Sequence, residues 1–505
     1  MEIASDKLFL VGMGPHSSHV VSVSICMKAG EESCADLPRS VLWAFAVCLL
    51  LRLIYLALLG NQLTAYYYEH TFAIQAINLL QGRGLQVHDD YLQTISDIQL
   101  KRFPTLVQPR EYPPYPQDHL GYYHATDMPG YPWFLAGVWR VVGPHSFWPI
   151  KGFQAIASAF LIFLVWDMAR RLFDSRTGVW AAWLYAAWLP LAYLSQMVSK
   201  EAAEGLLMIP ATWFLLRFLM EARYRDLVGC ALAFTCAVFM RTNLILLPGA
   251  LCVLGLLIFP WRRCAMALAA FCLVLVMALI PWVHRNKQFV DPGVGVKEGF
   301  YWALIWNLAS VDPALKAEIS KYEAMRSNPD GTLRKMMRPP PELEPLSKKV
   351  LQERRGLFLK LGALQLLRGP WSRLEWGFEI FPAGSRSYAE FHSLTGGSRS
   401  QYLMKYPHAV LFKILARVME LVVSILSLFC FWVRRREWKQ VLWVATCYGV
   451  FLCTYAFVHL EFRYIVPHTW PLLILAGASL SRIFQKSPEA AVKLNLSAVS
   501  TPVAG

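Results

Sequence analysis

The stretch VLWAFAVCLLLRLIYLALL, residues 41–59, decides the fold class of this chain. It is long and apolar enough to cross the hydrocarbon layer of a bilayer as a helix. Similar runs recur along the 505 residues, and a composition of 56% hydrophobic and 16% charged residues, with a mean hydropathy of +0.37, does not fit a soluble protein. The sequence therefore predicts an all-α, polytopic membrane protein.

About ten membrane-spanning helices are predicted from runs of this kind. They cover 41–59, 150–172, 179–194, 202–218, 227–239, 244–260, 265–283, 410–433, 441–458 and 464–483. Two long loops, 60–146 and 285–408, separate the first helix from a group within 147–284, and that group from the last three helices within 409–483. Loops this long are usually functional or disordered, and the Tyr, Trp and Pro content of these two indicates ordered binding surfaces. We expect the chemistry of the protein there.

Basic residues fall in small clusters at every second connection between the predicted spans. The clusters are Arg170, Arg171 and Arg176; Arg217, Arg223 and Arg225; Arg262 and Arg263; Arg434, Arg435 and Arg436; and Arg482 with Lys486. Because Lys and Arg in short connections resist translocation, the tails 1–40 and 484–505 are predicted to be cytoplasmic and both long loops to face the opposite side. We expect a multi-pass protein of the bacterial inner membrane in contact with membrane lipids. The net charge of +15 then reflects topology, and nucleic acid is not an expected partner.

Several enzyme classes lack their necessary residues in this sequence. There is no CxxC or HExxH spacing, no GxxxxGK loop and no GxSxG turn, and neither long loop contains a cysteine. His70, His284 and His459 lie near the predicted outer boundary without the spacing of metal ligands. We therefore expect no metal, no cofactor and no disulfide on the outer face. Met27 is a plausible alternative start, and the first span is expected to be a signal anchor.

The first long loop begins with a predicted surface helix. Apolar residues recur at helical spacing from Phe72 to Leu80, too short a stretch to span a membrane, and Gly82 and Gly84 follow. Glu69 sits at the first turn of this helix, where a carboxylate faces the membrane boundary and is favoured by the helix dipole. It is a candidate functional carboxylate at that boundary, or a residue that only caps the helix.

A second surface helix is predicted where HATDMPGYPWFLAG, residues 124–137, leads to Gly143. Pro129 and Pro132 start it, and an apolar stripe is expected to dock on the membrane. The stripe consists of Trp133, Phe134, Val138 and Val141. Asp127 precedes the helix and is a second candidate carboxylate, or a routine cap.

Six short motifs occur in a characteristic order along most of residues 41–483. They are LLQGRG at 79–84, PGYPWFLA at 129–136, SQMVSKE at 195–201, FMR at 239–241, PWVHRN at 281–286 and FRYIVP at 462–467. This order resembles glycosyltransferase family 39 of the GT-C membrane glycosyltransferases, a group that includes the protein O-mannosyltransferases and the aminoarabinose transferase of lipid A. One position departs from the resemblance, because Tyr68-Glu69 stands where the family usually has Asp-Glu.

The resemblance implies a GT-C fold and an inverting transfer of a hexose or pentose from a polyprenyl-phosphate carrier to a protein, lipid or glycan acceptor. Glu69 would act as the base, with Asp127 as the alternative. Basic residues at the outer ends of four spans, Lys200, Arg241, Arg285 and Arg463, are candidates for binding the phosphate, with Glu201 and Tyr464 beside them. Each cation could instead reach the interface only to stay solvated. A transporter or flippase and a catalytically inactive relative are the alternatives.

Overall fold

The structure is a computed structural model that describes residues 37–59, 67–82, 84–85, 128–143, 147–289, 308–309, 312–324, 343–368, 396–458 and 465–485. Every regular element within these ranges is a helix. The chain divides into two compact units, 1–37 and 38–505, and the helices that the structure describes belong to the second. The all-α prediction is confirmed for the described part of the chain.

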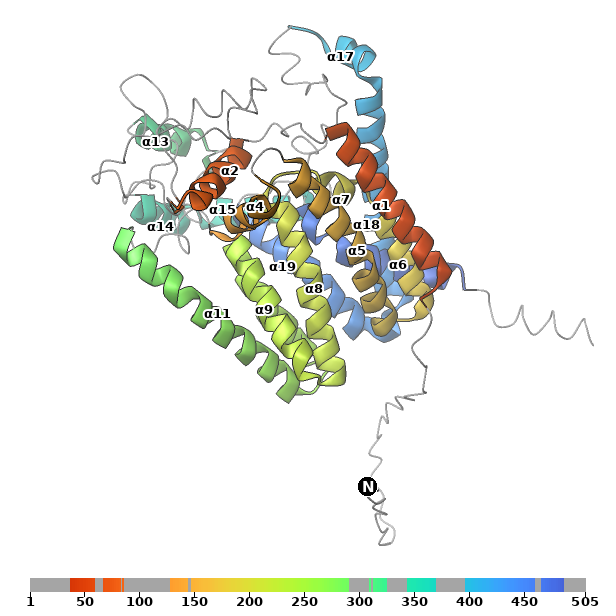
Figure 1. Cartoon of the computed structure of the whole chain (residues 1–505). Coiled ribbons are helices and arrows are strands. Elements are labelled where there is room, and N and C mark those ends of the chain that lie inside the picture. The colour runs from red at the N-terminus through yellow and green to blue at the C-terminus, as the bar shows by residue number, and fades with distance from the viewer. Residues whose placement is uncertain are drawn as a thin grey trace, which may run out of the picture. The chain divides into compact units, whose positions relative to one another are not determined.

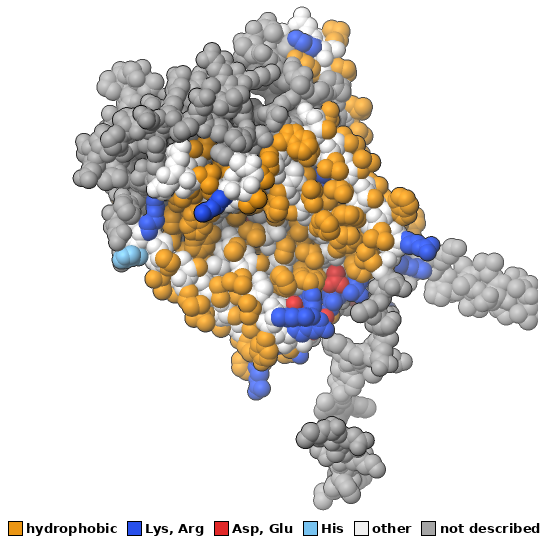
Figure 2. Space-filling view, in the orientation of Figure 1, with side chains coloured by type: hydrophobic (Ala, Val, Ile, Leu, Met, Phe, Trp, Pro, Cys, Tyr) orange, Lys and Arg blue, Asp and Glu red, His pale blue; other side chains and the backbone are white. Residues whose placement is uncertain are grey.

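Five of the described helices are long and apolar enough to cross a membrane. They are α1 (Arg39–Leu59), α5 (Trp148–Leu172), α8 (Lys200–Glu221), α11 (Trp261–Phe289) and α18 (Pro407–Val433). Large apolar side chains on them point outward, among them Leu273, which is 61% exposed, and Leu428, which is 71% exposed. Figure 2 shows such side chains as a broad hydrophobic surface over these helices. Helices of spanning length with an outward apolar surface fit a lipid environment, so the protein is an integral membrane protein.

The remaining apolar helices pack among the long ones. They are α6 (Ser175–Ala187), α7 (Leu189–Leu194), α9 (Tyr224–Met240), α10 (Leu246–Gly255), α19 (Trp438–Val458) and α21 (Trp470–Ile483). Helices α11, α9, α8, α5 and α1 follow one another as packed neighbours (Figure 1). The predicted count of ten spanning helices is not confirmed.

Three of the predicted spans are interrupted, and each interruption has a proline at or near it. The span expected over 179–194 divides at Trp188 into α6 and α7, because Pro190 lacks a backbone N–H and its neighbours leave the helical conformation. The span over 244–260 becomes the 3₁₀ turn η3 (Thr242–Ile245) followed by α10, with Pro248 in its first turn. The last span begins as η7 (Val466–His468) before α21.

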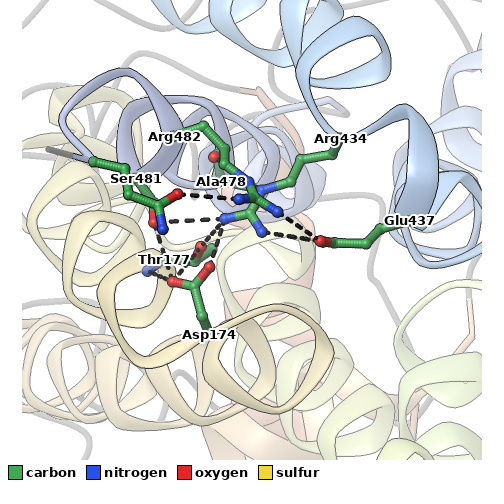
Figure 3. Close-up of polar contacts among 8 residues, drawn as sticks. Asp174, Thr177, Arg434, Glu437, Ala478, Ser481 and Arg482 are labelled. Carbon is green, nitrogen blue, oxygen red and sulfur yellow. Dashed lines mark hydrogen bonds and ion pairs between the residues drawn. The ribbon is translucent and has the colours of Figure 1, made fainter. Parts of the chain in front are cut away.

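The predicted basic clusters meet at one end of the helices, which we call the basic end. There Arg434 donates to Asp174, the N-cap residue of α6, and also pairs with Glu437 of η6 (Arg435–Glu437), as Figure 3 shows. Ser481 of α21 donates to the same Asp174 carboxylate at 3.0 Å. Arg171 pairs with Glu221 to join the ends of α5 and α8. Connections that are distant in sequence therefore share this end; which side of the membrane it faces stays a prediction.

The opposite end, which we call the loop end, carries the two surface helices α2 (Tyr67–Leu80) and α4 (Gly130–Val142). Both were predicted, and they pack together through a core that includes Phe72, Ala76, Tyr131 and Leu135. Gly82 follows α2 with a φ of +73°, a backbone conformation that residues other than glycine rarely adopt. Trp133, in the predicted membrane-facing stripe of α4, is 46% exposed, and Val141 is 85% exposed.

The second long loop contains a small helical unit. Helices α13 (Pro313–Ala324), α14 (Leu343–Glu353) and α15 (Arg355–Arg368) enclose a core that includes Leu308, Leu315 and Val350. Asp312 caps α13 and pairs with Arg354, and α15 packs along α19. A further helix, α17 (Arg399–Lys405), starts with a capping box at Ser398 and leads into α18.

Candidate functional site

The predicted site residues that the structure describes all lie at the loop end. Lys200 and Glu201 begin α8, Arg241 follows α9, and Arg285 lies near the end of α11. Glu69 is in the first turn of α2, but the placement of its side chain is outside the described residues. Asp127, Arg463 and Tyr464 also lie outside them.

A hydrogen-bonded path through Gln154 connects two of the motifs noted in the sequence. Tyr131 of PGYP donates its hydroxyl to Gln154 Oε1 at 3.2 Å. Gln154 Nε2 donates to the backbone carbonyls of Ser195 and Met197, at 3.1 and 2.8 Å. Because all these groups are buried, leaving any of them unpaired would be unfavourable. The path fixes the turn that leads into α8 and so fixes the backbone that carries Lys200.

Lys200 lies against the first surface helix. Its Nζ is 5.7 Å from the centroid of the Phe72 ring, within the range of a cation–π contact. Phe72 follows Glu69 by one helical turn of α2. The structure therefore brings the start of α8 and the turn that carries Glu69 together, although the two are far apart in sequence.

Arg241 is enclosed by acidic and aromatic side chains. Its Nη1 is 3.4 Å from Glu201 Oε1 and 3.4 Å from Glu204 Oε2, and its guanidinium carbon is 4.9 Å from the centroid of the Tyr455 ring. Glu201 and Glu204 are three residues apart, so both project from the same face of α8. The Arg241 side chain is 10% exposed and that of Glu204 is fully buried.

Glu204 also contacts a histidine from the end of the chain. His468 Nε2 is 2.7 Å from Glu204 Oε1, and the imidazole ring stacks on Phe451 with the centroids 3.3 Å apart. Sequence reasoning missed Glu204, His468 and Gln154. The only available signal was the three-residue spacing of Glu204 from Glu201, because the partners of Glu204 and Gln154 are remote in the chain.

Arg285 lines a cavity of about 250 Å³ at the loop end. The other lining residues are almost all apolar; they are Leu79, Gly84, Leu85, Trp133, Ala278, Pro281 and Trp282. The Arg285 guanidinium lies over the Trp282 ring at 5.0 Å, and Trp133 stacks on Phe239, two residues before Arg241. Such a cavity can hold an apolar chain beside a cation, which suits an amphiphile with an anionic headgroup.

Gly130, the glycine of PGYP, permits a close approach of α4 to the end of α9. A Cβ atom there would be 2.6 Å from the backbone oxygen of Phe239 and 2.9 Å from the nitrogen of Met240. The cavity wall formed by Trp133 and the position of Arg241 therefore depend on the same helix contact. Among the described residues, no group of three or more His, Cys, Asp or Glu could hold a metal ion.

Comparison with known structures finds weak similarity to two membrane enzymes. The archaeal oligosaccharyltransferase AglB from Archaeoglobus fulgidus, solved with an inhibitory peptide and a dolichol-phosphate, is 10% identical over 92% of this chain and 52% of its own, with a TM-score of 0.47. ArnT from Cupriavidus metallidurans, bound to undecaprenyl phosphate, is 15% identical over 88% of this chain and 78% of its own, with a TM-score of 0.39. The chain spans about half the length of AglB.

Comparison of sequences gives one family. No curated protein matches the chain. Residues 124–284, which run from α4 into α11 and include the motifs PGYP, SQMVSKE and FMR, match the family described as dolichyl-phosphate-mannose-protein mannosyltransferase. Over residues 124–284, the match confirms the resemblance to the protein O-mannosyltransferase group of the GT-C membrane glycosyltransferases.

Proposed function

We propose that the protein is a glycosyltransferase that moves a sugar from a polyprenyl-phosphate carrier to a hydroxyl or amine of an acceptor on the outer face of the membrane. The observation that carries the proposal is the apolar cavity beside Arg285. It offers a surface for an isoprenoid chain and a guanidinium for a phosphate, and it adjoins α2 and α4. The family match over residues 124–284 supports a donor of this kind.

The proposed chemistry is a single displacement. The Glu69 carboxylate accepts the proton of the acceptor hydroxyl or amine, whose oxygen or nitrogen forms a bond to the anomeric carbon of the sugar. The bond between that carbon and the phosphate oxygen breaks, polyprenyl phosphate leaves with the electron pair, and the anomeric configuration inverts. Asp127 is the alternative base, and no metal or cofactor takes part in the proposed step.

Basic side chains would stabilise the phosphate as it leaves. We assign this role to Lys200, Arg241, Arg285 and Arg463, with Tyr464 beside the last of them. Glu201 contacts Arg241 at 3.4 Å and would orient its guanidinium. Lys200 lies beside α2, and Arg285 lines the cavity, so both are at the loop end of the molecule.

The test is the fate of the donor lipid. Purified protein is incubated with polyprenyl-phosphate hexose and pentose donors and with acceptor extract, and free polyprenyl phosphate is measured by chromatography. We expect release that requires both the protein and the extract. If the intact donor instead crosses the bilayer of a proteoliposome without cleavage, the protein is a flippase. Binding of the donor without release or movement would identify an inactive relative, as the tyrosine at position 68 allows.

A further inference from the structure

Glu204 is a buried acidic residue at the loop end that has two basic partners. Its carboxylate is fully buried, and each oxygen contacts a basic side chain from a different part of the chain: Oε2 faces Arg241 at 3.4 Å and Oε1 faces His468 at 2.7 Å. A buried carboxylate is unfavourable unless it is paired in this way. The positions of the two partners are therefore tied to that of Glu204.

Aromatic rings of α19 hold the two partners from the other side. Arg241 lies over the Tyr455 ring at 4.9 Å, and His468 stacks on Phe451 with an interplanar angle of 6°. Tyr455 and Phe451 are four residues apart, so they lie on one face of that helix. Glu204 on α8 and these two rings on α19 thus clamp the guanidinium and the imidazole between two helices.

The second partner connects Glu204 to η7, the described start of the last predicted span. His468 ends η7, and α21 begins two residues later. Pro467 packs against Gly205 of α8, where an added Cβ would lie 3.7 Å from the Pro467 Cβ. The proline ring also restricts the backbone of η7. A shift of Glu204 would move Arg241 directly, and it would move η7 through His468.

We propose that Glu204 is a positioning residue of the transfer site. Its carboxylate holds Arg241 in register to receive the phosphate of the lipid donor and, through His468, ties η7 to α8. The inference rests on the proposed function, because it takes that phosphate as the ligand. Glu204 itself touches neither donor nor acceptor in this account.

The experiment measures the affinity for a polyprenyl phosphate, the proposed leaving group, which requires no knowledge of the sugar or the acceptor. Glu204→Gln keeps the size of the side chain and removes its charge. We expect its Kd to rise roughly ten- to a hundredfold, by analogy with the loss of affinity at metal sites when the partner that orients a ligand is removed. Glu204→Asp keeps the charge, so it should restore part of the affinity.

Asp174→Asn is the matched control, because it removes the carboxylate that pairs with Arg434 at the basic end. It should lower Tm and leave the Kd unchanged. In an Arg241→Met background, Glu204→Gln should raise the Kd by less than it does in the wild type, because part of its effect passes through Arg241. A role in folding alone would give the same factor in both backgrounds. If Glu204→Gln does not fold, His468→Gln takes its place with the same expectation.

The outcomes separate this inference from the proposed function. If the wild-type protein does not bind polyprenyl phosphate, the proposed function fails, and the inference fails with it. If the wild type binds it and both Glu204→Gln and His468→Gln bind equally well, only the positioning role is overturned. If Asp174→Asn weakens binding as much as Glu204→Gln, the effect is one of general stability and the inference is also overturned.

Discussion

Replacement of Gly130 by alanine should disturb both the stability of the protein and its donor site. The added Cβ would lie 2.6 Å from the backbone oxygen of Phe239, against the 3.4 Å at which ordinary contact begins, so α4 and the end of α9 must separate by about 0.8 Å. Both opposing atoms belong to backbone, so no side chain can rotate away. Overpacking of this kind typically costs about 1–3 kcal/mol.

Gly137→Ala provides the control, because Gly137 is in the same helix and has nothing within 4 Å of an added Cβ. It should leave Tm unchanged or raise it slightly, since alanine favours a helix interior by up to about 1 kcal/mol over glycine. Thermal unfolding of the purified variants in detergent measures both effects. Gly130→Ala should lower Tm by several degrees and weaken binding of polyprenyl phosphate, since Trp133 and Phe239 move. A Gly130→Ala variant as stable as the wild type, or a Gly137→Ala variant equally destabilised, would refute the reasoning.

Three other predictions test separate parts of the structure. Arg285→Gln should raise the Kd for polyprenyl phosphate about tenfold. Arg262→Gln, at the other end of α11, should not change it. Equal effects of the two substitutions would refute the assignment of the cavity as the donor site. Burial acts to raise the pKa of Asp174, but hydrogen bonds from Arg434 and Thr177 outweigh it and hold the pKa below the ordinary 3.8. The stability that Asp174 contributes is then complete above pH 3.8 and is lost as the pH falls through the lower pKa of the folded state. The Tm difference between the wild type and Asp174→Asn should therefore be constant above about pH 4 and shrink below it. A Tm difference that grows on acidification would contradict this prediction. In a cysteine-free background, Arg399→Cys should react with a membrane-impermeant thiol reagent added outside cells and Arg436→Cys should not, and the reverse pattern would overturn the predicted orientation.

Much of the fold follows from local patterns in the sequence. Hydrophobic runs and their periodicity predict the helices, including α2 and α4, because burial in lipid or against a neighbour acts on each segment separately. The breaks within the predicted spans were missed. A proline such as Pro190 marks a position where a helix can end, but the sequence alone does not show that the helix ends there. The alternation of Arg clusters correctly indicated which connections share an end, as the contact of Arg434 with Asp174 shows.

The site was predicted less completely, for a physical reason. Lys200, Glu201, Arg241 and Arg285 stand at helix ends, where polar residues are conspicuous in an apolar sequence. Glu204 lies within an apolar span and His468 is one of several histidines, and only the fold brings them within 2.7 Å across 264 positions of the chain. Contacts at such separation leave no periodic signal in one sequence.

The most direct test of the central claim is the acceptor-dependent release of polyprenyl phosphate by the wild type and by Glu69→Gln. We expect the wild type to release it and the variant to bind polyprenyl phosphate normally while releasing almost none, because the amide cannot accept the acceptor's proton. Asp127→Asn, measured alongside, assigns the base if Glu69→Gln stays active. Absence of release from the wild type with every hexose and pentose donor, while the intact donor lipid crosses a bilayer, would contradict the account.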